Sequence, residues 1–183
     1  GSGEIVFQPE LTCLCGSDTP YFTWSGEWPI ELGHSLHEMI GRVVATNGQR
    51  WKVGDRVLCV PVAQNGLWER YVVSEDRCVA IDPRCSDEEA VLAQPLGTAL
   101  FALKKLPTLV DLDVAIVGQG PMGQLFNMSV KALGARQVIG IDKLESRLKT
   151  SAKTGVTATI CNAADDPVAK LKELTGGKGA DIV

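Results

Sequence analysis

The sequence lacks a long apolar run, a cluster of like charges and any internal repeat. A membrane-spanning helix needs about 20 mainly apolar residues, so we do not expect a protein anchored by such helices. The net charge of −4, spread without basic clusters, argues against a nucleic-acid or anionic-membrane partner. No signal-peptide pattern opens the chain, and we therefore expect a cytoplasmic protein.

A regular cysteine framework is also missing. A small secreted domain would need closely and evenly spaced cysteines, so we expect reduced thiols here. With 45% hydrophobic residues, the 183-residue chain can build one large or two small cores. Apart from Cys15, we interpret the cysteines as ordinary buried thiols: Cys13, Cys59, Cys78, Cys85 and Cys161.

The most informative stretch covers residues 114–142. The apolar run 114–117 predicts a buried parallel strand, and a G-x-G-x-x-G turn follows at once. Gly118 allows the tight turn, Gly120 lets a pyrophosphate approach the backbone, and Gly123 lets the next helix pack closely. We therefore predict a dinucleotide site that includes Gly118, Gln119, Gly120, Pro121, Met122 and Gly123.

A helix and a second strand complete this pattern. The helix should present one apolar face, end at Gly134 and offer its N-terminal N–H groups to phosphates. The second strand ends at Asp142, which follows Gly123 by 19 residues and should accept hydrogen bonds from the adenosine ribose. A carboxylate there favours NAD(H) over NADP(H), although Lys143 weakens that preference. The predicted inward face comprises Met122, Leu125, Phe126, Ser129, Val130 and Leu133.

The N-terminal half is predicted to be β-rich. Short strands are expected over residues 4–8, 40–46, 56–60, 67–73 and 78–81, which suggests a small barrel or sandwich. Ser86 and Glu89 form a capping-box pattern, so a helix should begin there. A further helix is expected over residues 98–106, stopped before Pro107.

The C-terminal part continues the nucleotide-binding pattern. We predict a helix after Asp142, a strand over 157–160, a helix from Pro167 and the start of a strand over 180–183. A doubly wound sheet has roughly six strands, and about four are recognisable in this stretch. We therefore expect the second half of this domain to lie outside the sequence.

Two clusters in the N-terminal half carry potential metal ligands. One is the stretch 13–18, with Cys13, Cys15 and Asp18. The other contains both histidines of the chain, His34 and His37. Thiolate, imidazole and carboxylate are the ligands of zinc, and catalytic zinc takes three protein ligands and keeps one open position.

At these motifs the chain resembles the medium-chain alcohol and polyol dehydrogenases. The matching segments are residues 15–18, 37–43, 53–57, 118–142 and 179–181, in the family's order and over essentially the whole chain. The resemblance implies an α/β protein with a β-rich domain. It predicts a GroES-like β-barrel over residues 1–85, connecting helices over 86–108, and a truncated NAD-binding Rossmann domain, a doubly wound parallel sheet, over 109–183.

The same resemblance implies roles for individual residues. Cys15 and His37 would bind a catalytic zinc, and Glu38 would be a ligand or a neighbouring carboxylate. Ser17 would pass the substrate's hydroxyl proton towards solvent, and Asp18 would orient a ligand by hydrogen bonding. The implied protein is a homodimer or homotetramer. It transfers a hydride between NAD(H) and a secondary alcohol, polyol or sugar-like small molecule.

Several positions depart from the family's pattern. Gln94 stands where many members have a glutamate that completes the zinc site, and a neutral amide is a weaker ligand. His34 is a rival to His37, although Glu38 follows His37 in register. Pro20 replaces a histidine that often relays protons. The four-cysteine lobe of a structural zinc is missing, so no structural zinc is expected.

These departures leave alternatives open. A zinc-free NAD(P)H-dependent carbonyl or enoyl reductase of the same superfamily is the second hypothesis, which Gln94 favours. A nucleotide-binding relative without turnover is the third. Tyr21, Trp24 and Trp28 either line a substrate pocket or pack, and Arg147 either lies against the adenine or is solvated.

Overall fold

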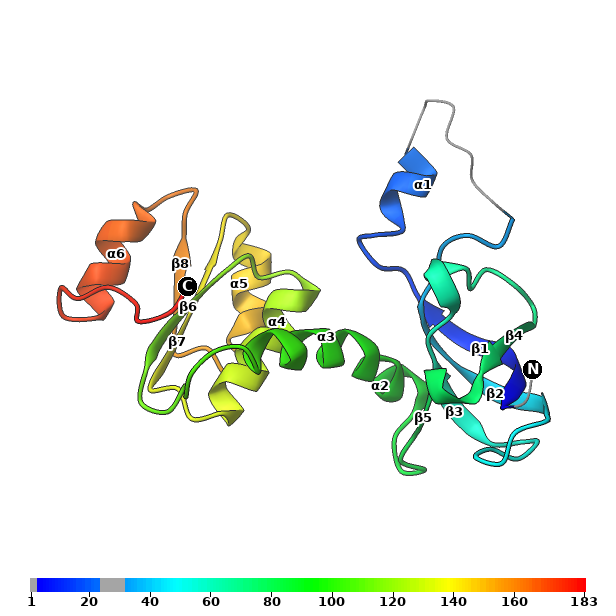
Figure 1. The fold of residues 1–183 in the computed structure, drawn as a ribbon. Helices are drawn as coiled ribbons and strands as arrows, with labels where there is room; N and C mark the ends of the chain where they lie inside the picture. Colours follow the sequence, from blue (N-terminus) through cyan, green and yellow to red (C-terminus); the bar gives the residue numbers. More distant parts are fainter. Residues whose placement is uncertain (1–2, 24–31) are drawn as a thin grey trace. The chain divides into compact units, whose positions relative to one another are not determined.

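The computed structural model describes residues 3–23 and 32–183 of the chain (Figure 1). The chain divides into two compact units, Gly1–Gln94 and Pro95–Val183, each with its own β-sheet. The first sheet is antiparallel and the second is parallel. The expected fold class, a β-rich part followed by a parallel α/β part, is confirmed. Among the described residues, no helix is both long and apolar enough to span a membrane.

The first unit is built on a five-stranded sheet in the order β4-β1-β2-β3-β5. Its strands are β1 (Glu4–Cys13), β2 (Glu38–Thr46), β3 (Arg56–Cys59), β4 (Tyr71–Ser74) and β5 (Cys78–Ala80). Side chains alternate across a strand, so Ile5 and Phe7 of β1 are buried on one face. They form a core with Met39, Val43, Val57, Cys59, Val73 and Cys78.

Short helical segments connect these strands. They are α1 (Thr19–Thr23), the two 3₁₀ turns η1 (Val62–Gln64) and η2 (Glu75–Arg77), and α2 (Asp87–Val91). The capping box of α2 is confirmed. Ser86 Oγ accepts the Glu89 N–H at 3.2 Å, and Glu89 Oε2 accepts the Ser86 N–H at 3.0 Å.

Several predicted boundaries differ from the structure. The strand expected over 4–8, for example, extends to Cys13. In place of the strand expected over 67–73, β4 covers only Tyr71–Ser74, because the Gly66 and Leu67 N–H groups donate to the Ser35 and Gly33 carbonyls instead of a sheet partner. The helix expected over 98–106 is α3 (Ala93–Leu103). It starts earlier because Pro95 lies in its first turn, where the missing N–H leaves no bond unmade.

The second unit has a three-stranded parallel sheet in the order β6-β7-β8. The strands are β6 (Asp113–Val117), β7 (Gln137–Asp142) and β8 (Ala158–Cys161), and the helices are α4 (Pro121–Ala132), α5 (Glu145–Ser151) and α6 (Pro167–Leu174). The expected strand at 180–183 is reduced to a single parallel bridge, in which the Ala115 N–H donates to the Ile182 carbonyl at 2.9 Å. It lies beside β6.

The buried face of α4 differs from the prediction. Met122 and Leu133 were expected to face inward, but they are 37% and 46% exposed. Gly123 decides the orientation, because a Cβ atom there would lie 2.0 Å from the Gly118 carbonyl oxygen. That close approach turns Gly123, Asn127 and Val130 into the protein, at helical spacings of four and three.

Candidate functional site

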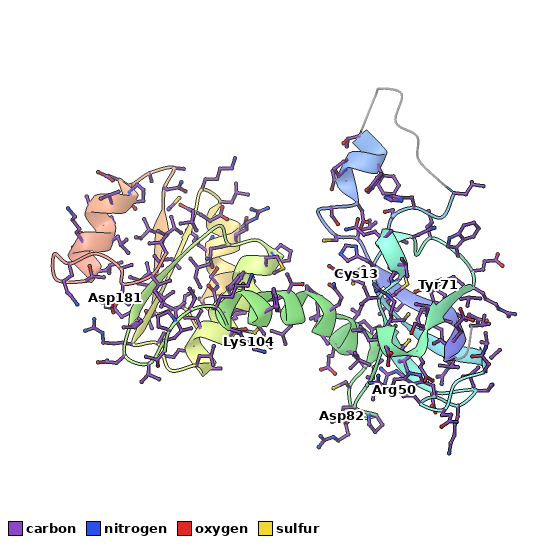
Figure 2. The ribbon with its side chains drawn as sticks, viewed as in Figure 1. Cys13, Arg50, Tyr71, Asp82, Lys104 and Asp181 are labelled. Atoms are coloured by element: carbon purple, nitrogen blue, oxygen red, sulfur yellow. The ribbon has the colours of Figure 1, made fainter. Side chains whose placement is uncertain are left out.

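The two clusters of potential metal ligands meet where β1 ends and β2 begins. Cys13, the last residue of β1, pairs with Glu38, the first residue of β2. Cys15 lies two residues beyond the strand end that Cys13 marks in Figure 2. One donor atom from each of Cys15, His37 and Glu38 lies within 4.8 Å of the others. Antiparallel pairing therefore brings together groups that are more than 20 positions apart in the sequence.

The chemistry of this donor set fits a metal ion. His37 Nε2 lies 4.0 Å from Glu38 Oε1, and their side chains are 13% and 10% exposed. His37 Nδ1 is buried and has no hydrogen-bond partner among the described residues. A buried polar atom without a hydrogen-bond partner costs about 1–3 kcal/mol. Coordination of an ion by the His37 imidazole would offset that cost. Thiolate, imidazole and carboxylate together are suited to zinc.

Asp18 holds the two segments of this cluster together. Its Oδ1 accepts the Ser35 hydroxyl at 2.7 Å and the Leu36 N–H at 2.9 Å, and its Oδ2 accepts the Cys15 N–H at 2.7 Å. Burial acts to raise the pKa of Asp18, but the bonds from Ser35, Cys15 and Leu36 outweigh it and lower that pKa. The carboxylate is therefore charged. It orients the backbone beside both Cys15 and His37. Its three hydrogen bonds do not involve the side chains of the candidate metal ligands.

The backbone before His37 is strained. Ser35 and Leu36 have φ angles of 95° and 66°, in the left-handed region that favours glycine. Such residues cost on the order of 1–3 kcal/mol each and persist only where their surroundings hold them. Asp18 holds these two residues by accepting the Ser35 hydroxyl and the Leu36 N–H. The Gly66 N–H also holds them, because it donates to the Ser35 carbonyl at 3.0 Å. Strain thus accumulates directly beside the donor cluster.

The other residues predicted near the metal have different surroundings. His34 Nε2 lies 2.8 Å from the Tyr21 hydroxyl and the two rings meet edge to face at 4.6 Å, so this histidine is engaged outside the donor group. Ser17 is exposed. Gln94 lies in the first turn of α3 and is partly buried. Trp24 and Trp28 lie outside the described residues.

The glycine turn connects β6 to α4 as predicted from its spacing. Gly118 has a φ of 91°, and its N–H donates to the Ile141 carbonyl at 2.8 Å. Gly120 is the N-cap residue of α4, with Pro121 in the first turn. A Cβ atom on Gly120 would meet nothing nearer than Arg147, at 3.9 Å, among the described residues. The turn therefore leaves its outer side open to a ligand at the N-terminus of a helix, where anions are favoured.

Asp142 ends β7 next to this turn and is only 5% exposed. It accepts the Gln119 N–H at 2.7 Å and the Leu144 N–H at 2.8 Å, and Arg147 Nη1 lies 3.5 Å away. The hydrogen bonds from Gln119 and Leu144 lower its pKa against the opposing effect of burial, and Arg147 adds to them. A charged, oriented carboxylate thus stands beside the glycine turn, while Lys143 is exposed.

Both units of the chain match known proteins. The family model for the alcohol dehydrogenase GroES-like domain matches residues 1–83, and the model for zinc-binding dehydrogenases matches residues 121–183. L-threonine 3-dehydrogenase of Bacillus velezensis is 30% identical in an alignment that covers 98% of this chain and 61% of that protein. Both models describe domains of alcohol-type dehydrogenases and together they match most of the chain, so these comparisons support the medium-chain dehydrogenase/reductase family.

Other known proteins match over similar lengths. D-xylulose reductase of Saccharomyces cerevisiae is 28% identical, again over 98% of this chain and 61% of that protein. An Escherichia coli oxidoreductase/dehydrogenase of unknown specificity shares the fold, with a TM-score of 0.87 and 23% identity. The match covers 99% of this chain and 62% of that one. The chain thus spans about three fifths of the length of these curated relatives.

In the second unit, the side chain of Gln119 has a position that sequence reasoning missed. It is 1% exposed and turned into the protein beneath the glycine turn. Its Nε2 donates to the Ile116 carbonyl at 2.9 Å, and its Oε1 accepts Asn127 Nδ2 at 2.7 Å and Ser151 Oγ at 2.6 Å. The polar Asn127 between apolar positions of α4 was the available signal.

Proposed function

We propose that this chain carries the metal site and the dinucleotide site of a zinc-dependent dehydrogenase. The enzyme would transfer a hydride between NAD(H) and a secondary alcohol, polyol or sugar-like compound. The grouping of Cys15, His37 and Glu38 carries this proposal, because it supplies three zinc-type donors in one place. The relatives named for threonine, xylulose, and erythritol or threitol support a small hydroxylated substrate.

On the metal side, Cys15, His37 and Glu38 would hold the zinc, and the amide oxygen of Gln94 is a further candidate ligand. Bound zinc would supply Lewis acidity, which lowers the pKa of an alcohol as it does that of water. Asp18 would keep both ligand-bearing segments in place through its three hydrogen bonds. Ser17, which is exposed beside Cys15, would pass the substrate's hydroxyl proton towards solvent.

On the dinucleotide side, the N-terminus of α4 would receive the pyrophosphate at Gly120. The Asp142 carboxylate would accept the ribose hydroxyls, and the Gln119 and Leu144 N–H groups already hold it in one orientation. Its negative charge would repel a 2′-phosphate, so NAD(H) is the proposed cofactor. Arg147, beside both Asp142 and Gly120, lies where it would contact the adenosine part.

Metal analysis tests the proposal directly. The chain, purified without chelator, should contain about one zinc, in keeping with one three-ligand site. Cys15→Ser should lose most of that zinc, whereas Cys85→Ser, which changes another partly buried thiol, should retain it. Circular dichroism of each variant separates ligand loss from unfolding. Well under one zinc in the wild-type chain, or full zinc in folded Cys15→Ser, would refute the metal assignment.

A zinc-free reductase is the second candidate. Gln94 favours it, since a neutral amide replaces the expected carboxylate. A quinone oxidoreductase of Pseudomonas syringae also shares the fold, with 25% identity, a TM-score of 0.83 and coverage of 98% of this chain and 57% of that one. A chain that binds NADPH and contains no zinc would favour this candidate over the dehydrogenase.

A further inference from the structure

Two buried cysteines face each other across neighbouring strands of the first unit. Cys59 of β3 pairs with Cys78 of β5 in antiparallel register. The adjacent pair, Val60 and Arg77, is hydrogen-bonded, because the Val60 N–H donates to the Arg77 carbonyl at 3.1 Å. Along an antiparallel ladder, hydrogen-bonded and non-hydrogen-bonded residue pairs alternate. Cys59 and Cys78 therefore form a non-hydrogen-bonded pair, in which the Cα atoms are about 4.5 Å apart. A disulfide requires roughly 4.4–6.8 Å, so the backbone need not move to allow one.

The two thiols are chemically unequal. Both cysteines are fully buried. The hydrogen bond from the Cys78 thiol lowers the pKa of Cys59 against the opposing effect of burial, and the same bond together with burial raises the pKa of Cys78. The Tyr71 hydroxyl, labelled in Figure 2, lies 3.5 Å from Cys59 Sγ and can donate to it. These pKa directions make Cys59 the thiol that ionises first, and Cys78 is its partner across the strands.

The place of β5 in the sheet gives a small reagent a route to this pair. β5 has three residues and lies at the edge of the sheet, next to β3. Val79, which follows Cys78, is 57% exposed. Short edge elements open locally at lower free energy than the rest of a fold. Opening of this one strand would expose Cys59 and Cys78 together.

We propose that Cys59 and Cys78 form a site of reversible thiol oxidation, joined by a cross-strand disulfide when the chain meets hydrogen peroxide. The Cys59 thiolate attacks one peroxide oxygen, so an S–O bond forms, the O–O bond breaks and hydroxide leaves. Cys78 then loses its proton and attacks the Cys59 sulfur, so the S–S bond forms and the second oxygen leaves as water. Two thiols are oxidised and one peroxide is reduced to two waters. A dithiol reductant reverses the step by thiol–disulfide exchange.

Peptide mapping provides the test. The chain is treated with hydrogen peroxide, free thiols are alkylated under denaturing conditions, and the protein is digested with trypsin. Cleavage at arginines puts Cys59 in peptide 57–70 and Cys78 in peptide 78–84, with no other cysteine in either. The expected product is these two peptides joined, two hydrogens lighter than their sum, and separated again by reduction.

Variants and the remaining thiols complete the experiment. Cys161→Ser should leave the cross-linked product unchanged, and Cys78→Ser should abolish it. If Cys78→Ser does not fold, mapping of the wild-type chain alone decides. The proposal is overturned if peroxide leaves Cys59 and Cys78 alkylated as free thiols while other cysteines oxidise, or if Cys59 is joined to a different cysteine. It involves the first unit only, so neither result depends on the proposed dehydrogenase activity.

Discussion

Replacement of Asp18 by asparagine tests how the donor cluster is held. In the wild-type chain one carboxylate oxygen accepts from Ser35 and Leu36 and the other from Cys15. An amide has one acceptor atom, so in Asp18→Asn its NH₂ group faces the N–H of Cys15 or the donors of the 35–36 segment. One charge-assisted bond, worth about 1.5–3 kcal/mol, is lost, and the remaining bonds weaken because the charge is gone.

We therefore expect Asp18→Asn to lower the free energy of unfolding of the first unit by about 3 kcal/mol. Tryptophan fluorescence in a urea titration reports this unit specifically, since all four tryptophans lie between residues 24 and 68. Asp76→Asn is a matched control. Its side chain is 85% exposed and pairs only at the surface, 3.4 Å from Arg50, so the change should stay within about 0.5 kcal/mol.

The pH dependence gives an independent check. The pKa of Asp18 is lowered in the folded chain, so its contribution to stability is complete above the unfolded value, about 3.9, and is lost as the pH falls towards the folded value. The difference in the free energy of unfolding between wild type and Asp18→Asn should therefore be constant near neutral pH and should decrease below about pH 4. If Asp18→Asn loses no more stability at pH 7 than Asp76→Asn, the role assigned to Asp18 is wrong.

Three further predictions address other parts of the chain. Asp142→Asn should raise the dissociation constant of NADH about tenfold and reduce discrimination against NADPH, because the charge facing the ribose is lost. Equilibrium titration measures the dissociation constants of NADH and NADPH. An unchanged ratio of these two constants would contradict the role assigned to Asp142. Ala63→Gly should raise the unfolding free energy by about 1 kcal/mol, because exposed Ala63 has a left-handed φ of 51°; a destabilised variant in the urea titration would refute this. Gln119→Leu should accelerate amide hydrogen exchange across α4 by at least about tenfold, because Asn127 and Ser151 lose the buried oxygen that accepts their hydrogen bonds. Unchanged exchange would show that these hydrogen bonds are not needed to stabilise α4.

Local sequence determined the dinucleotide half of this protein. The glycine turn, the helix start at Pro121 and the acidic residue at the end of β7 follow one another along the chain, so their spacing was sufficient to predict them. The capping box of Ser86 and Glu89 was predictable for the same reason, since both partners lie within one helical turn. Family resemblance added Cys15, His37 and Glu38 as candidate ligands.

Only the tertiary structure decided how those candidates are arranged. His34 and His37 are three positions apart and chemically equal, and they differ because Tyr21 engages one while strand pairing places the other beside Cys15. The three bonds of Asp18 reach residues up to 18 positions away, which no local pattern encodes. The buried orientation of Gln119 depends equally on Ser151 from another helix. Short-range spacing specifies turns and caps, but long-range pairing of strands and loops determines which side chains meet.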